Sequence, residues 1–180
     1  MRVGVIAATT RPGRKSIGVA GWVATRTGDR DALEPDVIDL GELNLPLFDE
    51  PEHPRNRRYQ HDHTRTWSAT VDEWDALVIV TPEYNHSYPG SLKNALDYLY
   101  WEWHGLPVGF VSYGGKSAGV RAVQHLQSVA LELGMHPLHA DVAIAFHRDY
   151  LDEADAFHPD DRHECELGAL LDELQERTMP

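Results

Sequence analysis

Short apolar runs alternate along the chain with longer stretches in which apolar residues recur every three or four positions. The short runs are rich in β-branched residues and nearly continuous, a pattern typical of strands covered on both faces of a parallel sheet. They occupy residues 3–6, 37–40, 76–80, 107–113 and 142–146. The longer stretches predict amphipathic helices. They occupy residues 17–24, 67–74, 92–99, 123–133 and 167–174.

The alternation of five predicted strands with five predicted helices indicates a doubly wound α/β fold. We expect a three-layer sandwich, with a five-stranded parallel sheet between helices on both faces. The expected strand order is 2-1-3-4-5. The chain has 180 residues, the size of one domain, and no repeat or low-complexity linker divides it. Residues 1–180 are therefore expected to form a single domain.

One segment, residues 41–64, does not follow this alternation. It holds three prolines, many charged residues and no clear apolar period. A structureless segment of this length is uncommon inside a compact domain and usually has a function. We expect it to lie over the binding site or against a partner subunit.

Binding chemistry is expected where the predicted strands end, since ligands of open α/β sheets bind beyond the carboxyl ends of the strands. The first candidate loop is residues 9–16, Thr-Thr-Arg-Pro-Gly-Arg-Lys-Ser, which follows the first strand. Its three hydroxyls and three cations stand beside a helix N-terminus, where unpaired N–H groups favour an anion. Arginine can also bind a phosphate through two parallel hydrogen bonds. The loop suits a terminal monophosphate, and the alternative is a capped surface loop with Ser16 as the N-cap.

Two further candidate loops follow the third and fourth predicted strands. Residues 81–91, Thr-Pro-Glu-Tyr-Asn-His-Ser-Tyr-Pro-Gly-Ser, offer an amide, two aromatic rings and backbone N–H groups. These groups suit a flat heteroaromatic ligand. Residues 112–119, Ser-Tyr-Gly-Gly-Lys-Ser-Ala-Gly, contain paired glycines that permit close approach of the backbone. Ordinary strand-to-helix turns remain the alternative for both loops.

The net charge of −13 argues against non-specific binding to nucleic acid, which requires a basic face. Residues 141–180 contain twelve Asp or Glu against three Arg, whereas the first 28 residues contain no acid at all. An acidic chain that keeps one basic stretch is expected to bind an anion there. No apolar run is long enough to span a bilayer, no signal-peptide pattern is present, and the single cysteine, Cys165, excludes an internal disulfide. These features favour a soluble, cytoplasmic protein without a membrane partner.

Four segments resemble the signature segments of the NAD(P)H-dependent FMN reductase family. They are residues 10–14 (Thr-Arg-Pro-Gly-Arg), 82–85 (Pro-Glu-Tyr-Asn), 92–97 (Leu-Lys-Asn-Ala-Leu-Asp) and 113–115 (Tyr-Gly-Gly). A Leu-Pro-x-x-Asp-Glu segment that is common in the family is matched by residues 45–50. The resemblance runs from the first strand to about Pro137 and implies a flavodoxin-like fold with bound FMN. Ala8 and Ser87 depart from it, since the family commonly has glycine at both positions.

The resemblance also implies roles for individual residues. It puts the FMN phosphate in the loop after the first strand, and the isoalloxazine ring between the loops after the third and fourth strands. The expected cofactor-binding residues are Thr9, Arg11, Arg14, Ser16, Ile17, Pro82, Glu83, Tyr84, Asn85, Ser112, Tyr113, Gly114 and Gly115.

The activity that the resemblance implies is transfer of hydride from NAD(P)H, as co-substrate, through FMN to a small acceptor. We expect a ping-pong cycle in which the donor leaves before a quinone, a flavin, an azo compound or a metal oxyanion binds. Because the flavin carries the chemistry, the protein mainly positions it, and the candidates for a catalytic role are Tyr84, Asn85 and His86. NADH and NADPH both remain open as donors. An electron carrier of the flavodoxin type, without NAD(P)H turnover, is the principal alternative, and a hydrolase ranks far behind.

Histidines and aromatic residues outside these loops suggest an interface rather than a second chemistry. The eleven histidines include His61 and His63, but without thiolates they form no compelling ligand set, so no metal site is expected. An aromatic group follows the third predicted helix: Tyr98, Tyr100, Trp101 and Trp103. Core packing and a subunit interface are both open for it. The family's oligomers favour the interface, and we expect a homodimer or homotetramer.

Overall fold

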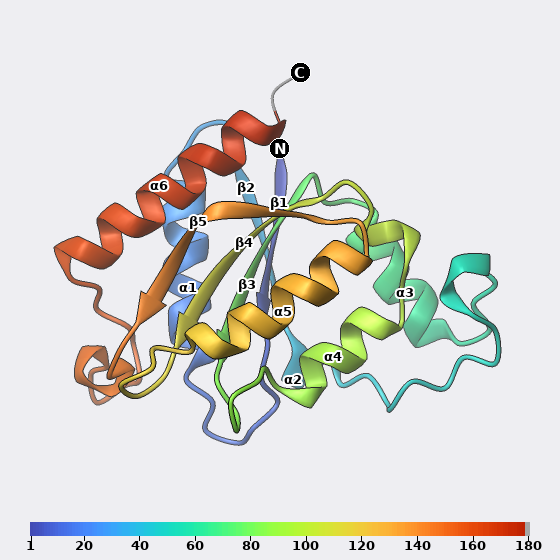
Figure 1. Cartoon of the computed structure of the whole chain (residues 1–180), viewed down its shortest axis with the longest axis horizontal. Helices are drawn as coiled ribbons and strands as arrows, with labels where there is room; N and C mark the ends of the chain where they lie inside the picture. The colour runs from blue at the N-terminus through green and yellow to red at the C-terminus, as the bar shows by residue number, and fades with distance from the viewer. Residues whose placement is uncertain (179–180) are drawn as a thin grey trace.

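The computed structural model describes residues 1–178 and places a five-stranded parallel sheet between two layers of helices (Figure 1). The strand order is β2-β1-β3-β4-β5, as predicted. The strands are β1 (Arg2–Ala7), β2 (Glu34–Asp39), β3 (Ala76–Pro82), β4 (Pro107–Tyr113) and β5 (His136–Ile144). The helices are α1 (Ser16–Gly28), α2 (Leu40–Leu43), α3 (Asp62–Val71), α4 (Gly90–Asp97), α5 (Val120–Glu132) and α6 (Asp161–Thr178). Three short 3₁₀ turns are η1 (Pro54–Asn56), η2 (Trp101–Trp103) and η3 (His147–Tyr150).

The central strands lie close to their predicted positions, whereas the two edge strands do not. β2 begins three residues before the predicted run at 37–40, and β5 covers 136–144 instead of 142–146. An edge strand has an unpaired side that contacts solvent, so polar residues enter its sequence and interrupt the apolar run. In β5, Leu138 and Val142 are buried while His139 and Asp141 are exposed.

The sheet separates two apolar cores. Side chains of one parity along β1, such as Val5, pack with α1 and α6. Those of the other parity, such as Ile6, pack with α3, α4 and α5 on the opposite face (Figure 1). This arrangement explains the near-continuous apolar runs of the central strands, because both faces of the sheet are covered.

Three tryptophans fill the core beneath α3. Trp67 contacts Trp74 and Trp103 edge-on, with ring centroids 5.6 Å and 5.9 Å apart. The Trp74 ring lies directly on β1, and a Cβ atom added at Gly4 would stand 2.4 Å from it. Glycine at position 4 therefore lets the ring reach the backbone of the sheet.

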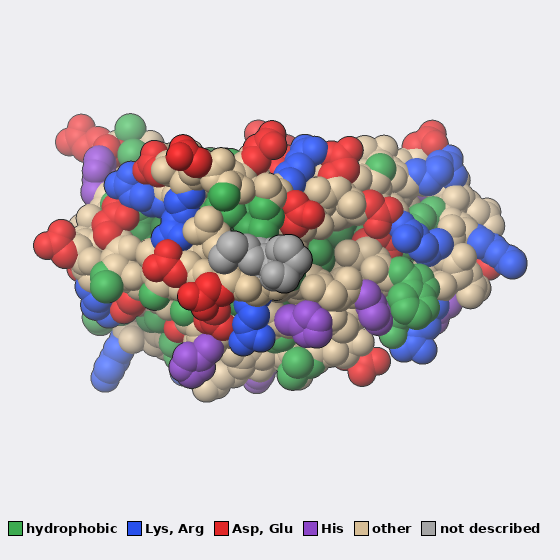
Figure 2. All heavy atoms as spheres, turned by 90° about the horizontal axis from the view of Figure 1, so that it is seen from above, with side chains coloured by type: hydrophobic (Ala, Val, Ile, Leu, Met, Phe, Trp, Pro, Cys, Tyr) green, Lys and Arg blue, Asp and Glu red, His purple; other side chains and the backbone are tan. Residues whose placement is uncertain are grey.

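The surface at the amino ends of the strands carries interleaved acidic and basic side chains, as the view in Figure 2 shows. Arg2, at the start of β1, pairs with Asp36 at 3.2 Å and also with Glu73. Arg30, which follows α1, lies 2.6 Å from Asp172 of α6. The cations at this end of the molecule are therefore neutralised by neighbouring carboxylates. Within residues 1–178, no helix is long and apolar enough to cross a membrane.

Candidate functional site

Loops at the carboxyl ends of four strands enclose a cleft of about 300 Å³. Those after β1, β3 and β4 are the three candidate loops of the sequence, and the fourth follows β5. The lining residues are Thr9, Arg11, Gly13, Arg14, Lys15, Pro82, Glu83, Tyr84, Tyr113, Gly114, Gly115, His147 and Arg148. The strand order reverses between β1 and β3, so the cleft lies where ligands of this architecture bind.

The loop after β1 presents the N-terminus of α1 to the cleft. No side chain caps this helix, and its first turn contains no acidic residue. Arg11 lines the cleft and has no carboxylate partner within residues 1–178. Ser16 is completely buried, and its hydroxyl forms no hydrogen bond of normal geometry in the described chain, although the Tyr113 hydroxyl lies close by. A free guanidinium, open helix N–H groups and an unsatisfied hydroxyl together suit an oxyanion.

Arg14 also lines the cleft, but its charge is matched by Asp39 at the end of β2. Its Nε lies 3.0 Å from each carboxylate oxygen, and a second guanidinium nitrogen pairs with the same group. The Asp39 side chain is nearly buried by this contact. Arg14 can therefore bind a phosphate only while it shares its guanidinium with Asp39.

The loop after β3 turns through a tight two-residue hairpin. Tyr84 and Ser87 exchange backbone hydrogen bonds of 2.7 Å and 3.0 Å. Between them, Asn85 and His86 are left-handed, with φ of 50° and 71°. Ser87 itself is not left-handed, so the absence of glycine there causes no backbone strain. The turn points the Tyr84 hydroxyl across the cleft, where it lies 2.7 Å from the Thr9 hydroxyl.

Glu83 ties this loop to the one after β4. Its carboxylate accepts hydrogen bonds from the Arg121 guanidinium, one at 2.8 Å, and from the Ser117 hydroxyl at 3.3 Å. The bond from Arg121 outweighs burial and lowers the pKa of Glu83 below its ordinary value. Glu83 therefore lines the cleft as a charged side chain that links the two loops, and its carboxylate is not available as an acid or base.

The loops after β4 and β5 form the opposite wall. His147 Nδ1 lies 2.9 Å from the Gly114 carbonyl, and its ring contacts that of Tyr113 at a centroid distance of 5.0 Å. The backbone amides of Phe146 and His147 donate to the carbonyls of Gly115 and Gly114, each at 3.1 Å. Burial raises the pKa of Tyr113, so its hydroxyl stays protonated. The wall is an aromatic surface bordered by exposed backbone.

Residues 115–119 match the G-x-S-x-G pattern that carries the nucleophilic serine of many hydrolases. In those enzymes the serine occupies a strained turn and has a histidine partner. Here Ser117 is not left-handed, and its hydroxyl donates to Glu83 rather than to a histidine. The left-handed residues are instead Ala118 and Gly119. The segment is a turn that begins α5, not a nucleophile elbow.

Most of the predicted cofactor-binding residues line the cleft. Those that do not are Ser16 and Ile17 at the start of α1, Asn85 in the hairpin and Ser112 near the end of β4. The candidate His86 stands exposed at the tip of the hairpin. His147 and Arg148 line the cleft but were not predicted from the sequence. A signal for them existed, because they follow the last strand and its carboxyl end shares the same edge of the sheet.

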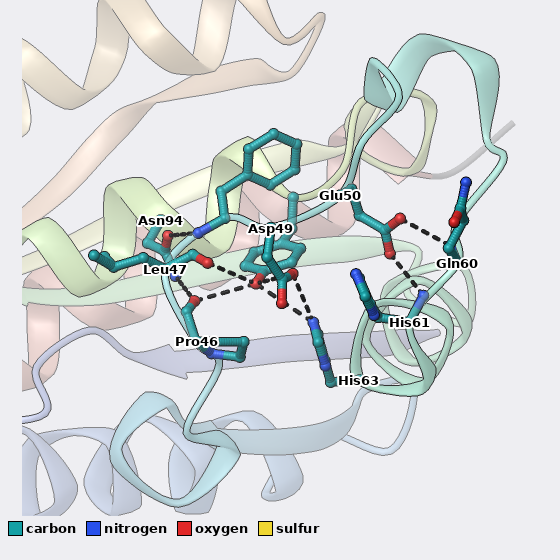
Figure 3. Close-up of polar contacts among 10 residues, drawn as sticks. Pro46, Leu47, Asp49, Glu50, Gln60, His61, His63 and Asn94 are labelled. Atoms are coloured by element: carbon teal, nitrogen blue, oxygen red, sulfur yellow. Dashed lines mark hydrogen bonds and ion pairs between the residues drawn. The ribbon is translucent and has the colours of Figure 1, made fainter.

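The long segment between α2 and α3, which has no apolar period in its sequence, is not structureless. It is ordered along α4 of the same chain, and it includes η1. Asn94 of α4 accepts a hydrogen bond from the amide of Phe48 at 2.9 Å and donates to the carbonyl of Pro46 at 2.7 Å (Figure 3). Polar contacts with α4, rather than periodic apolar packing, hold the segment in place.

Two acidic side chains fasten the far end of this segment. Asp49 accepts hydrogen bonds from Tyr98 and His63, each at 3.0 Å (Figure 3). Burial raises the pKa of Asp49, but these two bonds outweigh it, and the net shift is downward. Glu50 is buried and accepts from two backbone amides just before α3, at 2.8 Å and 3.0 Å. The segment therefore packs on its own chain beside the cleft.

The aromatic group after α4 divides between core and surface. Tyr98 and Trp103 are fully buried, so the prediction of an interface is wrong for these two. Trp101 is 49% exposed, and Tyr100 is partly buried beneath Arg55. Within residues 1–178, no group of three or more histidine, cysteine, aspartate or glutamate side chains is arranged to hold a metal ion.

The residues present fit FMN. The uncapped start of α1 and Arg11 match a phosphate at one end of the cleft. Tyr84, Tyr113 and the backbone of Gly114 and Gly115 match a flat ring at the other.

Comparison with known proteins agrees with this fit. Residues 1–149 match the family described as NADPH-dependent FMN reductase. A Saccharomyces cerevisiae protein named NAD(P)H-dependent FMN reductase LOT6 is 37% identical over 147 residues, which cover 76% of this chain and 76% of that protein. A Burkholderia protein named 2-hydroxy-1,4-benzoquinone reductase is 38% identical over 88 residues, 47% of this chain and 40% of that protein.

Among solved structures, the flavoenzyme NAD(P)H:(acceptor) oxidoreductase FerB from Paracoccus denitrificans has a TM-score of 0.75 with this chain. It is 21% identical, and the alignment covers 98% of both chains, so it shows the flavodoxin-like fold. The family match shows the cofactor and the activity, because residues 1–149 include every residue that lines the cleft. The chain therefore belongs to the NADPH-dependent FMN reductase family, and it is an NAD(P)H-dependent oxidoreductase with FMN as its cofactor.

Proposed function

We propose that residues 1–180 form one FMN-binding domain that reduces a small planar acceptor of the quinone type in a ping-pong cycle. The observation that carries this proposal is one cleft to which the loops after β1, β3, β4 and β5 all contribute. Donor and acceptor must reach the cofactor through the same opening, which favours successive rather than simultaneous binding. The aromatic side chains of Tyr84, Tyr113 and His147, which line the cleft from different loops, favour a flat acceptor. The benzoquinone reductase among the relatives supports that choice.

The chain's own residues supply binding and orientation. Thr9, Arg11 and the start of α1 would hold the phosphate, while the loops after β3 and β4 would hold the ring. The FMN held there would supply the hydride and electron transfer between nicotinamide and acceptor. The Tyr84 amide is committed to the Ser87 carbonyl, but the amides of Glu83 and Asn85 have no backbone partner within residues 1–178. These two N–H groups are placed to stabilise negative charge on the ring edge.

Three residues of the hairpin are candidates for a direct role in the reaction: Tyr84, Asn85 and His86. Tyr84 lines the cleft and is 36% exposed, so its hydroxyl can reach an acceptor. Either oxygen can donate in its hydrogen bond with Thr9, so Tyr84 can accept from Thr9 and keep its own proton for an acceptor. We therefore propose Tyr84 as the proton donor to the acceptor, with Asn85 holding the ring edge.

The first experiment is an anaerobic visible spectrum of the FMN-loaded protein before and after addition of NADPH, and then of NADH. We expect the flavin band to bleach within the dead time of manual mixing and to return when a benzoquinone is added. Bound flavin that neither nucleotide bleaches would refute the proposal and establish a flavodoxin-type electron carrier. Parallel lines in a double-reciprocal plot of initial rates are the expected sign of the ping-pong cycle.

The hairpin assignment is tested by Asn85→Gly. Glycine keeps the left-handed backbone of position 85 and removes only the side chain. We expect weaker FMN binding and slower reduction by the nucleotide. The control is Asn56→Gly, which removes the same side chain in the exposed 3₁₀ turn η1, outside the cleft. Full flavin affinity and full turnover in Asn85→Gly would show that the hairpin side chain does not contact the cofactor.

We also propose that the enzyme is a homodimer or homotetramer. Leu47, Phe48 and Trp101 are 84%, 41% and 49% exposed, an unusual concentration of large apolar side chains near the long segment and η2. Light scattering during size-exclusion chromatography measures the mass directly. A monomeric mass at micromolar concentration would rule out this part of the proposal.

A further inference from the structure

Within residues 1–178, three cationic side chains have no carboxylate partner, and all three belong to loops around the FMN cleft. They are Arg11, Lys116 and Arg148. Every other lysine and arginine lies within 4.0 Å of a carboxylate oxygen. In a chain with a net charge of −13, unpaired cations are expected to be rare. Their collection around one cleft indicates that the cleft takes more than one anionic group.

The three cations belong to three of the loops around the cleft. Arg11 stands on the loop before α1, close to the open helix N-terminus. Lys116 directly follows Gly115, and Arg148 lies in η3 after β5. The backbone hydrogen bonds at 3.1 Å between the segments 114–115 and 146–147 hold these two loops together. Lys116 and Arg148 therefore lie on two loops that are bonded to each other, whereas Arg11 belongs to the loop after β1.

The FMN phosphate does not need the second pair of cations. It carries one phosphate group, which Arg11, the α1 N-terminus and the nearby hydroxyls already match. Lys116 and Arg148 are both exposed, so they suit a group that arrives from solvent with the co-substrate. NADPH differs from NADH by a phosphate on the adenosine ribose, the half of the molecule away from the reacting ring. An arginine can bind such a phosphate through two hydrogen bonds.

We propose that Arg148, assisted by Lys116, binds the 2′-phosphate of NADPH and makes the enzyme prefer NADPH over NADH. The inference rests on the proposed function, in that both nucleotides must reach the FMN through this cleft. It assigns the loop after β5 a role in donor selection.

The test compares the FMN-loaded wild-type protein with Arg148→Gln, Lys116→Gln and the control Arg58→Gln. Arg58 has a 74% exposed side chain on the long segment, so its replacement removes the same charge away from the cleft. We expect Arg148→Gln to lower kcat/KM for NADPH about tenfold while that for NADH changes less than about twofold. Lys116→Gln should have a smaller effect of the same kind, and Arg58→Gln should have none.

A second measurement does not depend on turnover. Adenosine 2′,5′-diphosphate is titrated calorimetrically into each FMN-loaded variant, with adenosine 5′-monophosphate for comparison. We expect Arg148→Gln to weaken binding of the 2′-phosphorylated probe about tenfold and to reduce the salt dependence of its affinity. Binding of the monophosphate should be nearly unchanged.

The outcomes separate this inference from the proposed function. An unchanged ratio of NADPH to NADH efficiency in Arg148→Gln overturns the inference alone. Loss of FMN affinity without loss of riboflavin affinity also overturns it, because Arg148 would then serve the FMN phosphate. If neither nucleotide bleaches the wild-type flavin, the proposed function fails, whereas selective loss of the 2′-phosphorylated probe would still show the anion site.

Discussion

Replacement of Ser16 by alanine tests the phosphate site with opposite effects on the free and the FMN-bound protein. In the structure the Ser16 hydroxyl is buried without a hydrogen bond of normal geometry. A buried hydroxyl that lacks a partner costs about 1–3 kcal/mol. Alanine removes that cost, so we expect the free energy of unfolding of the apoprotein to rise by about 1 kcal/mol.

With FMN bound, we expect the Ser16 hydroxyl to rotate about χ1 and donate to the phosphate at the start of α1. A hydrogen bond to a charged group contributes about 1.5–3 kcal/mol, and 1.4 kcal/mol corresponds to a factor of ten in affinity. The Ser16→Ala protein should therefore bind FMN at least about tenfold more weakly. Riboflavin, which lacks the phosphate, should bind with unchanged affinity.

The assay is urea unfolding of the apoprotein, followed by titration of FMN and riboflavin monitored through quenching of flavin fluorescence. Thr25→Ala is the matched control, since Thr25 lies on the exposed part of α1 and its hydroxyl donates to the Gly21 carbonyl. It measures the gain in helix propensity without a buried hydroxyl. Subtracting its effect isolates the contribution of the unsatisfied group.

Two results would refute this reasoning. If Ser16→Ala destabilises the apoprotein, the hydroxyl has a partner in the folded chain, and Tyr113 is the nearest one. Tyr113→Phe would then reproduce the loss. If FMN affinity stays within a factor of two of the wild-type value, the hydroxyl does not contact the phosphate, and the helix N–H groups and Arg11 hold it without Ser16.

Three further predictions concern the framework of the site. The Glu102 side chain is fully buried, accepts hydrogen bonds from three residues and anchors the long segment. Glu102→Gln should therefore lower the free energy of unfolding in urea by about 2–4 kcal/mol. The control Asp72→Asn, at a half-exposed side chain, should lower it by less than about 1 kcal/mol. Gly119 has φ of 84°, and an added Cβ would stand 3.0 Å from the Tyr113 backbone. Gly119→Ala should therefore destabilise the fold by about 1–3 kcal/mol and weaken FMN binding. The control Gly168→Ala has open space around it in α6 and should stabilise the fold slightly. Burial lowers the pKa of His163 in α6 below its ordinary value, so the unfolded chain binds a proton that the folded chain does not, and stability should fall as the pH drops below about 6.5. His163→Asn should flatten this fall between about pH 5 and 7, and an unchanged slope would contradict the assignment.

The fold could be predicted from the sequence because the central strands are covered on both faces. β1, β3 and β4 appear as continuous apolar runs, and their order follows from the alternation with helices. β2 and β5 could not be bounded, because an edge strand in contact with water is not required to be apolar. The long segment escaped prediction for a related reason. It is fixed by carboxylate and amide contacts, such as those of Asp49 and Asn94, which leave no period in the sequence.

The error at β5 also hid part of the site. The sequence placed the end of this strand at residue 146, but the strand ends at Ile144, and His147 then lies in the loop beside Gly114. The three loops that were predicted have paired glycines, prolines or clustered hydroxyls, which mark turns near ligands. The loop after β5 has none of these marks. Only the topology shows that it shares an edge of the sheet with the others.

Arg14 and Arg148 show that the position of a cation in the sequence does not tell whether a carboxylate neutralises it in the fold. Arg14 belongs to the one stretch of the chain without acids, and it therefore looked free to bind a phosphate. Asp39, twenty-five residues later, reaches it from the end of β2. Arg148 belongs to the acidic residues 141–180, yet no carboxylate within residues 1–178 approaches it. Because ion pairing depends on which strand ends are adjacent, the availability of a cation for a ligand is a property of the fold, and it is the unpaired Arg148 that we expect to recognise the incoming nucleotide.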